Sequence, residues 1–219
     1  MTKKLLISIS LASAACVSPL PAQSLDKFTT NIGGGISSPL NPTSQYTGLS
    51  GNFSLAAGYK IGKNDAVVGE FQWNGLPPNL FVLHPVDAPR GSINLYSLAA
   101  NYRHQIDRIH GSPFGLYAIA GGGWYYRHAS VDKDYVVPPG TVCQPIYTYW
   151  GYGCYGGYVY TAQVAYRGLS APGLDAGVGF TIRFADSNWR FYTEARYIYA
   201  FHSNVATTLV PVTLGIRFN

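Results

Sequence analysis

The sequence predicts an all-β fold, an antiparallel β-barrel that crosses a membrane with its strands. Of 219 residues, 47% are hydrophobic and only 11% are charged, which is few charges for a soluble domain. Glycine (25) and tyrosine (18) are abundant, and short runs of alternating apolar and polar residues recur along the chain, as in membrane-spanning strands. After residue 22 no continuous apolar stretch of about 20 residues follows, so a spanning helix is not expected.

The first 22 residues have the three-part layout of a secretory signal peptide. Lys3 and Lys4 precede the apolar run 5–17, and Ala22 follows two prolines. We expect cleavage near Ala22, which leaves residues 23–219 as a single domain. Removal of the two lysines lowers the formal charge from +5 to +3, which is too small to indicate a nucleic-acid partner.

Three cysteines are present. Cys16 lies within the signal segment, where a lipoprotein signal is a weaker alternative because Ser13 stands at a position that normally holds a leucine-like residue. Cys143 and Cys154 remain after export, and an oxidising compartment favours a disulfide between them. Neither a CxxC spacing nor a nearby histidine supports metal binding, and no metal or cofactor is expected.

Eight runs of the mature chain predict strands. In seven of them, apolar residues alternate with polar or small ones, so that one face is suited to lipid and the other to the barrel interior. The predicted strands are 28–36, 52–61, 67–74, 96–103, 114–125, 174–184, 189–199 and 210–218. The glycines at 121–123 obscure the facing of the fifth run, which is assigned on composition. A ten-stranded barrel with two more strands between the fifth and sixth runs is an alternative.

Apolar and polar residues also alternate along the strands of a soluble β-sandwich or lipocalin. The lengths of the connectors favour a membrane barrel instead. Short connectors (62–65, 105–113 and 186–188) alternate with long ones (37–49, 75–92 and 127–171). Short turns on one side and long loops on the other are typical of such barrels. Aromatic residues also gather near the strand ends, as at membrane interfaces. They are Tyr59, Tyr102, Phe184, Trp189 and Phe218 at the turn side and Trp73, Trp124 and Phe201 at the loop side.

The last predicted strand carries the most specific resemblance. Its outward positions are Val210, Val212, Leu214, Ile216 and Phe218. This pattern resembles the C-terminal targeting signal of small bacterial outer-membrane barrels, typified by the transmembrane domains of outer-membrane proteins A and X, although Asn219 follows the final aromatic residue. The resemblance covers nearly the whole mature chain. It implies an eight-stranded antiparallel up-and-down transmembrane β-barrel with long extracellular loops, inserted into outer-membrane lipid by the barrel-assembly machinery.

Charged residues occupy many of the predicted interior positions. They are Lys60, Glu70, Arg103, Asp175, Arg183, Arg190, Glu194, Arg196 and Arg217. Because unpaired charges are costly where water is scarce, we expect these groups to pair or hydrogen-bond. An eight-stranded barrel is filled by its own side chains, so a polar plug is the main interpretation and a narrow gated pore the alternative.

An enzyme is a less favoured alternative. The triplet His202, Ser203 and Asn204 resembles the His-x-Ser-Asn motif of lipid A deacylases, but the intervening residue is missing. Adjacent strand residues face opposite sides, so His202 and Ser203 are not expected to share a proton. No catalytic residue is therefore assigned.

The tyrosine-rich segment 127–171 predicts a structural or surface-interaction role, in adhesion or ligand recognition. Tyrosine gives a large contact area at low entropy cost. The candidate recognition residues are Tyr147, Tyr149, Trp150, Tyr152 and Tyr155. Alternatively, the flanking strands extend beyond the membrane and the tyrosines pack across a protruding hairpin. The extracellular ligand is unknown, and we expect a monomer.

Overall fold

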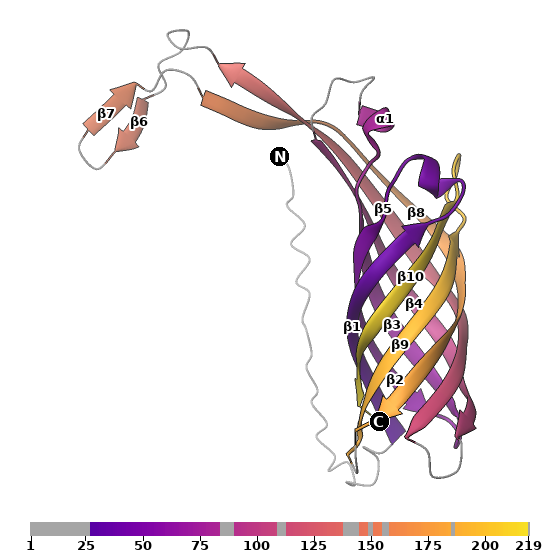
Figure 1. Ribbon diagram of the computed structural model, residues 1–219. Coiled ribbons are helices and arrows are strands. Elements are labelled where there is room, and N and C mark those ends of the chain that lie inside the picture. Colours follow the sequence, from indigo (N-terminus) through magenta and orange to yellow (C-terminus); the bar gives the residue numbers. More distant parts are fainter. Residues whose placement is uncertain are drawn as a thin grey trace, which may run out of the picture.

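Eight antiparallel strands form a closed barrel in the computed structural model (Figure 1), which describes residues 27–83, 90–108, 113–137, 145–148, 151–154, 158–184 and 187–218. The strands of the barrel are β1 (Phe28–Pro39), β2 (Ser50–Lys60), β3 (Asp65–Leu76), β4 (Arg90–Arg108), β5 (Phe114–Val137), β8 (Tyr158–Arg183), β9 (Trp189–Ala200) and β10 (Thr207–Phe218). Among the described residues, no helix is long and apolar enough to cross a membrane.

The strands follow one another around the ring in the order β1, β10, β9, β8, β5, β4, β3, β2. The first and last strands close it, with Ile32 opposite Ile216 and Asn31 opposite Arg217. Closure gives each strand a hydrogen-bonding neighbour on both sides within the barrel, which lipid requires because it cannot satisfy backbone groups. The prediction of an eight-stranded barrel is confirmed, and the ten-stranded alternative is wrong.

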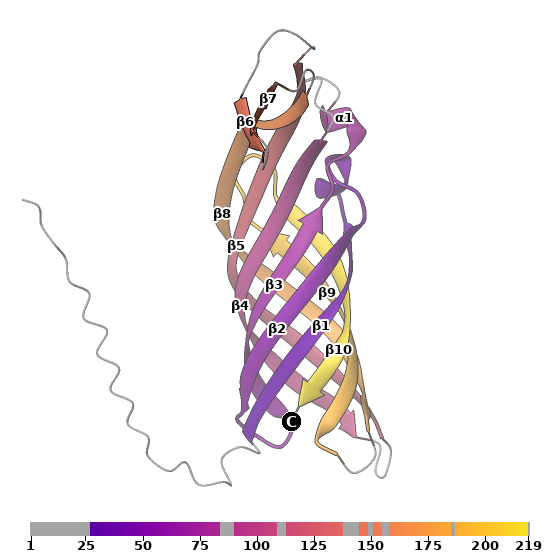
Figure 2. The same cartoon turned by 90° about the vertical axis from the view of Figure 1, so that its left-hand side faces the viewer.

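The two ends of the barrel differ (Figures 1 and 2). Residues 61–64 and two further short connections lie at one end, the turn end, together with the start of β1 and the end of β10. The other end, the loop end, carries the connection 40–49 with a 3-10 turn, η2 (Thr43–Gln45), and the connection 77–89 with a short helix, α1 (Leu80–Leu83). The connection 201–206 between β9 and β10 also lies at this end and is short; it was not among the connectors compared in the sequence.

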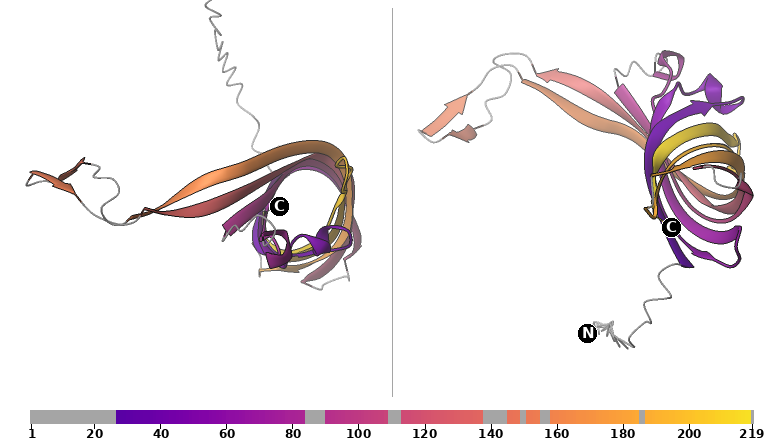
Figure 3. Two further views of the ribbon diagram at one scale, coloured as in Figure 1. Left: turned by 90° about the horizontal axis from the view of Figure 1, so that it is seen from above. Right: turned by 60° about the horizontal axis from the view of Figure 1, so that its bottom comes forward.

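β5 and β8 are much longer than predicted and continue beyond the barrel at the loop end (Figure 3). β4 accompanies β5 only as far as Asp132, and β9 reaches only Gly173 of β8. We call residues 127–137 and 158–172 the ribbon, and residues 133–137 and 158–162 its tip. Most of the predicted long loop is therefore strand. Beyond the tip, β6 (Pro145–Thr148) and β7 (Gly151–Cys154) form a separate small hairpin.

Alternation along the strands separates a lipid-facing surface from the interior, as predicted. On β3, for example, Val67, Phe71 and Trp73 are exposed while Glu70 and Gln72 are buried inside the barrel. β5 follows the same rule despite its glycines, so its inward residues include Tyr117 and Tyr125.

Exposed aromatic side chains form a belt near each end of the barrel. At the turn end, Phe28 packs against Tyr59 and Trp189 against Phe218, with ring centroids 5.6 and 5.3 Å apart. On β5, Phe114 and Trp124 mark the two belts and are ten positions apart. At a rise of about 3.3 Å per residue and a tilt of about 40°, this separation spans roughly 25 Å, the height of the apolar band of outer-membrane barrels.

Candidate functional site

An ion cluster occupies the middle of the barrel. The guanidinium of Arg196 on β9 donates to the carboxylates of Glu70 on β3 and Glu194 on β9, and lies 3.5 Å from Asp175 on β8. All four side chains are buried. The amide of Asn101, oriented with its nitrogen toward Asp175 and its oxygen toward Arg196, is 3.0 Å from each. One arginine thus holds three carboxylates from three strands.

A second cluster lies nearer the turn end. The guanidinium carbon of Arg217 is 4.4 Å from the ring centroid of Tyr117 and 5.0 Å from that of Tyr192, both within cation–π range. Arg217 also donates to Asn31 at 3.0 Å, which places the cation between aromatic faces and an amide oxygen. The hydroxyl of Tyr117 donates to Glu194 at 2.7 Å and so connects this cluster to the ion cluster.

Glycine makes the second cluster possible. A Cβ atom on Gly179 of β8 would lie 2.1 Å from the ring of Tyr117, closer than any real contact. The missing side chain gives the tyrosine its space inside the barrel.

An apolar layer lies between the ion cluster and the loop end. It consists of Leu76, Leu95, Tyr125, Ile198, Ala200 and Leu209, all buried. The hydroxyl of Tyr125 donates to Asp175 at 2.9 Å, which joins this layer to the ion cluster. Side chains therefore fill the interior at successive levels, as expected for a barrel of eight strands.

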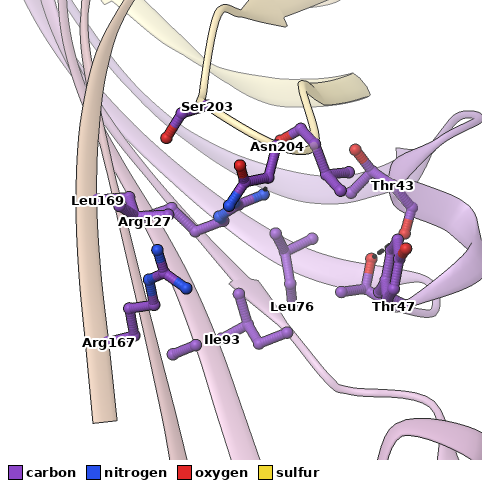
Figure 4. A pocket seen from close by; sticks show the side chains of 12 residues that line it. Thr43, Thr47, Leu76, Ile93, Arg127, Arg167, Leu169, Ser203 and Asn204 are labelled. Atoms are coloured by element: carbon purple, nitrogen blue, oxygen red, sulfur yellow. Dashed lines mark hydrogen bonds between the residues drawn. The ribbon is translucent and has the colours of Figure 1, made fainter.

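A pocket opens above this layer at the loop end (Figure 4). Its volume is about 280 Å³, and Leu76 and Ile93 form part of its floor. Arg127 on β5 and Arg167 on β8 point into it from one side, and Asn204 from the connection 201–206 faces them. We call this cavity the mouth pocket.

A chain of hydrogen bonds fixes the connection that covers the mouth pocket. Arg127 donates to the hydroxyl of Thr207 at 3.0 Å, and that hydroxyl is 3.1 Å from Nδ1 of His202. Nε2 of His202 is 3.2 Å from the carbonyl oxygen of Leu169, which can only accept, so Nε2 carries the proton and Nδ1 accepts from Thr207. Burial and the positive charge of Arg127 lower the pKa of His202, which favours this neutral form.

The same contacts bear on the histidine–serine motif. His202 and Ser203 lie in the connection 201–206 and not in a strand, so the expectation of strand geometry at these two residues is wrong. Both ring nitrogens of His202 are already engaged, by Thr207 and Leu169. The histidine therefore orders the connection, and its geometry offers no base for Ser203.

The predicted interior residues occupy four different places in the structure. Glu70, Asp175, Glu194 and Arg196 form the ion cluster, whereas Arg103 and Arg217 lie near Tyr117 in the second cluster. Lys60 and Arg190 line a small cavity at the turn end together with Arg103 and Arg217. Arg183 is exposed at the last position of β8, where a long side chain can extend past the barrel into solvent.

The predicted recognition residues are only partly described. Tyr147 on β6 stands opposite Tyr152 on β7, and Cys154 stands opposite Pro145. Tyr149, Trp150, Tyr155 and Cys143 lie outside the described residues, as does the signal segment, so the disulfide and the cleavage site stay predictions.

Sequence reasoning missed the tyrosines of the interior and the arginines of the mouth pocket. Tyr117, Tyr125 and Arg127 share one face of β5 with the interior, but the glycine run hid the facing of that strand. Continuing the alternation from Arg127 backwards across the glycines would have identified all three.

Solved structures of other proteins are similar to this chain over most of its length. Neisserial surface protein A is 16% identical over 87% of this chain and 96% of its own, with a TM-score of 0.52. Ail, the attachment invasion locus protein of Yersinia pestis, is 16% identical over 88% of this chain and 98% of its own, with a TM-score of 0.48. A major outer-membrane protein of Thermus thermophilus is 9% identical over 87% and 98%, with a TM-score of 0.49. No protein-family model and no curated protein matches the sequence.

The closed ring of eight strands, the apolar band between two aromatic belts and the likeness to Neisserial surface protein A agree with one another. Short turns mark the periplasmic end of such barrels, and the loop end therefore faces outward. The chain has the fold of the small eight-stranded outer-membrane β-barrels.

Proposed function

We propose that the protein acts in surface recognition, as an adhesin or ligand-capture protein, through its ribbon. The observation that carries the proposal is the length of β5 and β8, which have 24 and 26 residues against 11 or 12 in β1, β2, β3, β9 and β10. At about 3.3 Å per residue, the stretch 158–172 of β8 beyond β9 is roughly 50 Å long. Spanning the membrane does not require this length.

Exposed aromatic rings along the ribbon support the proposal. Tyr135 and Tyr160 stack across the tip with ring centroids 5.4 Å apart. Nearer the barrel, Tyr126, His128 and Tyr166 form a row across the two strands, with centroid distances of 6.3 and 6.5 Å. Such rigid rings offer contact area at low entropy cost, as in binding loops.

The outer edge of β8 supplies a second element of recognition. Along residues 158–172, no strand of the described chain pairs with β8 on the side where β9 would continue. Unpaired backbone groups on such an edge can accept an extended polypeptide as an added strand. The exposed side chains of Val159 and Val164 would contribute apolar contacts to that partner. We infer that an extended segment of an external protein is the preferred ligand.

The hairpin β6–β7 extends this surface. Tyr147 and Tyr152 are neighbours across it, and the proposal includes the other predicted tyrosines of the segment and Trp150 as contact residues. A bridge between Cys143 and Cys154 would restrict the segment and so lower the entropy lost on binding. Mass spectrometry of the non-reduced mature protein tests that bridge.

An enzymatic role is not proposed. Among the described residues, the nearest approach to a catalytic pair is His202 with Ser203, and His202 is held by Thr207 and Leu169 instead.

The test is deletion of the ribbon tip. Residues 133–162 are replaced by an Asn-Gly turn, which joins Asp132 to Gln163, a pair that is already in register. Bacteria that display the full chain should adhere to epithelial monolayers or to surfaces coated with extracellular matrix proteins more strongly than bacteria without the protein. Bacteria that display the shortened chain should adhere no better than bacteria without the protein.

Phe81→Ser is the matched control, because Phe81 is an exposed aromatic residue at the same end but on α1. It should leave adhesion unchanged. Equal adhesion by the full and the shortened chain would refute the recognition role of the ribbon tip and of the hairpin β6–β7. When a coated protein does bind, amide exchange in residues 158–172 should slow, as strand addition requires.

A further inference from the structure

We propose that the mouth pocket is a binding site for a small organic anion with an apolar body, of the size and chemistry of an aromatic monocarboxylate. The site is distinct from the ribbon tip and does not depend on the recognition function proposed above. Its volume of about 280 Å³ lies near the lower end of the range for small-molecule sites, which suits a small ligand.

Charge is the first reason. Arg127 and Arg167 lie close enough that each repels the other, and neither has an acidic partner among the described residues. The residues that line the pocket include no aspartate or glutamate. An anion placed between the two guanidinium groups would relieve the repulsion and accept hydrogen bonds from both.

The orientation of Arg127 is the second reason. Its Nη1 atom donates to the carbonyl oxygen of Val205 at 3.3 Å and to Thr207 at 3.0 Å, which fixes the plane of the guanidinium. Its other N–H groups make no hydrogen bond to described residues, and the side chain lines the pocket (Figure 4). A donor held in place before binding loses little entropy when a ligand arrives.

Asn204 completes the polar wall. Its backbone has a φ of 74°, in the left-handed region that asparagine tolerates better than most residues. Its side-chain amide faces Arg127 across the pocket (Figure 4) and can donate to the same anionic group.

Apolar side chains also line the pocket and select the class of anion. Leu76, Ile93 and Leu169 are among the lining residues, and Leu76 belongs to the buried apolar layer. A strongly hydrated inorganic ion would leave these surfaces in contact with water, whereas an aromatic ring would cover them. This arrangement of apolar walls with a few convergent polar groups is typical of small-molecule sites.

The experiment uses the full mature chain in phosphatidylcholine nanodiscs, with benzoate as the probe and saturation-transfer NMR as the readout. Wild type should bind benzoate saturably, and acetate and inorganic phosphate should bind at least tenfold more weakly at equal ionic strength. Benzyl alcohol, which has the ring without the charge, should also bind at least tenfold more weakly.

Arg167→Gln is the test variant, because the Arg167 side chain makes no hydrogen bond or ion pair with the described residues and its loss should not disturb folding. It should weaken benzoate binding at least tenfold. Arg90→Gln is the matched control: it removes one positive charge from the same end of the protein, outside the pocket, and should change affinity less than twofold. Heat-modifiable gel migration verifies that each variant is folded.

Three results would overturn the proposal: no saturable benzoate binding to wild type, an equal loss in both variants, or phosphate binding as tight as benzoate. Deletion of residues 133–162 should leave benzoate binding unchanged, because none of the lining residues is removed. The proposal for the mouth pocket and the proposal for the ribbon can therefore be refuted independently.

Discussion

The same two strands, β5 and β8, build both the most enclosed and the most exposed parts of the molecule. Inside the barrel, Tyr117 and Tyr125 of β5 are 0% and 1% exposed, and each donates its hydroxyl to a carboxylate. Beyond the barrel, Tyr135 of β5 is 40% exposed and Tyr166 of β8 is 75% exposed. Neighbouring strands make the difference, because they enclose one half of each long strand and leave the other half in solvent.

The comparison separates stability from recognition. Tyrosine hydroxyls in the interior satisfy buried carboxylates, where a lost hydrogen bond leaves a charged group without a partner. Rings on the ribbon stack on one another and remain exposed to solvent. Substitutions of the same kind should therefore have large effects in the barrel and almost none in the ribbon.

The largest effect is expected for Arg196→Met. This change leaves Glu70, Glu194 and Asp175 buried together without their shared cation, which should cost about 3–5 kcal/mol of unfolding free energy. Denaturant unfolding in zwitterionic detergent, followed by tryptophan fluorescence, measures it. Arg90→Met removes an exposed ribbon pair with Asp134 and should cost less than about 1 kcal/mol. Similar losses for the two variants would mean that the ion cluster does not stabilise the barrel.

A smaller effect is expected from removing single tyrosine hydroxyls. Tyr125→Phe takes away the hydrogen bond to Asp175 and should cost about 1.5–3 kcal/mol, the range for hydrogen bonds to charged groups. Tyr135→Phe on the ribbon is the matched control and should stay within about 0.5 kcal/mol of wild type. The same unfolding assay measures both, and equal stability of the two variants would contradict the assigned role of Tyr125.

The sequence predicted the barrel well because its information is local. Alternation within one strand determines which residues face lipid, and it placed Glu70, Asp175, Glu194 and Arg196 inside. Pairing was harder to foresee, because Arg196 on β9 meets Glu70 on β3 across the barrel. That contact depends on how the whole ring closes, which no single strand encodes.

The ribbon was underestimated for a different physical reason. Beyond the barrel, lipid and interior no longer require alternation, and tyrosine and valine occur on both faces of the ribbon strands. The alternating pattern of a membrane strand is therefore absent after Tyr126. The loss of period was interpreted as a loop. Mixed burial around Arg127 and Arg167 likewise concealed the mouth pocket, which is lined by residues of four strands and of the connections 40–49 and 201–206.

A pH effect confined to the loop end should be smaller still. The lowered pKa of His202 means that the folded protein holds the neutral form more firmly than the unfolded chain does, whose histidine titrates near pH 6.5. Neutral His202 therefore contributes its full stabilisation to the connection 201–206 above pH 6.5. This contribution is lost as the pH falls from there through the lower pKa of the folded state. The positive charge of Arg127 opposes protonation of His202.

The protection factor of the Thr207 amide, which is its exchange relative to the intrinsic rate at the same pH, should then fall several-fold on acidification, while protection in the middle of the barrel changes less. His202→Gln removes the titrating group and should flatten the response at Thr207. An unchanged pH dependence in that variant would assign the effect to other groups.

The smallest effect is expected from the largest deletion. Replacing residues 133–162 by a two-residue turn removes the tip and the β6–β7 hairpin, yet the pairs from Asp132 and Gln163 downward keep their register. The removed strands β6 and β7 pair with each other, and the two strands of the tip pair with each other. The deletion also removes the exposed ion pair between Asp134 and Arg90 of β4, which contributes little to stability. Unfolding free energy and heat-modifiable migration should match wild type within about 0.5 kcal/mol, although thirty residues are missing from the sequence. A marked loss of stability would show that the ribbon supports the barrel, and the separation between a stabilising interior and a recognition surface would then not hold.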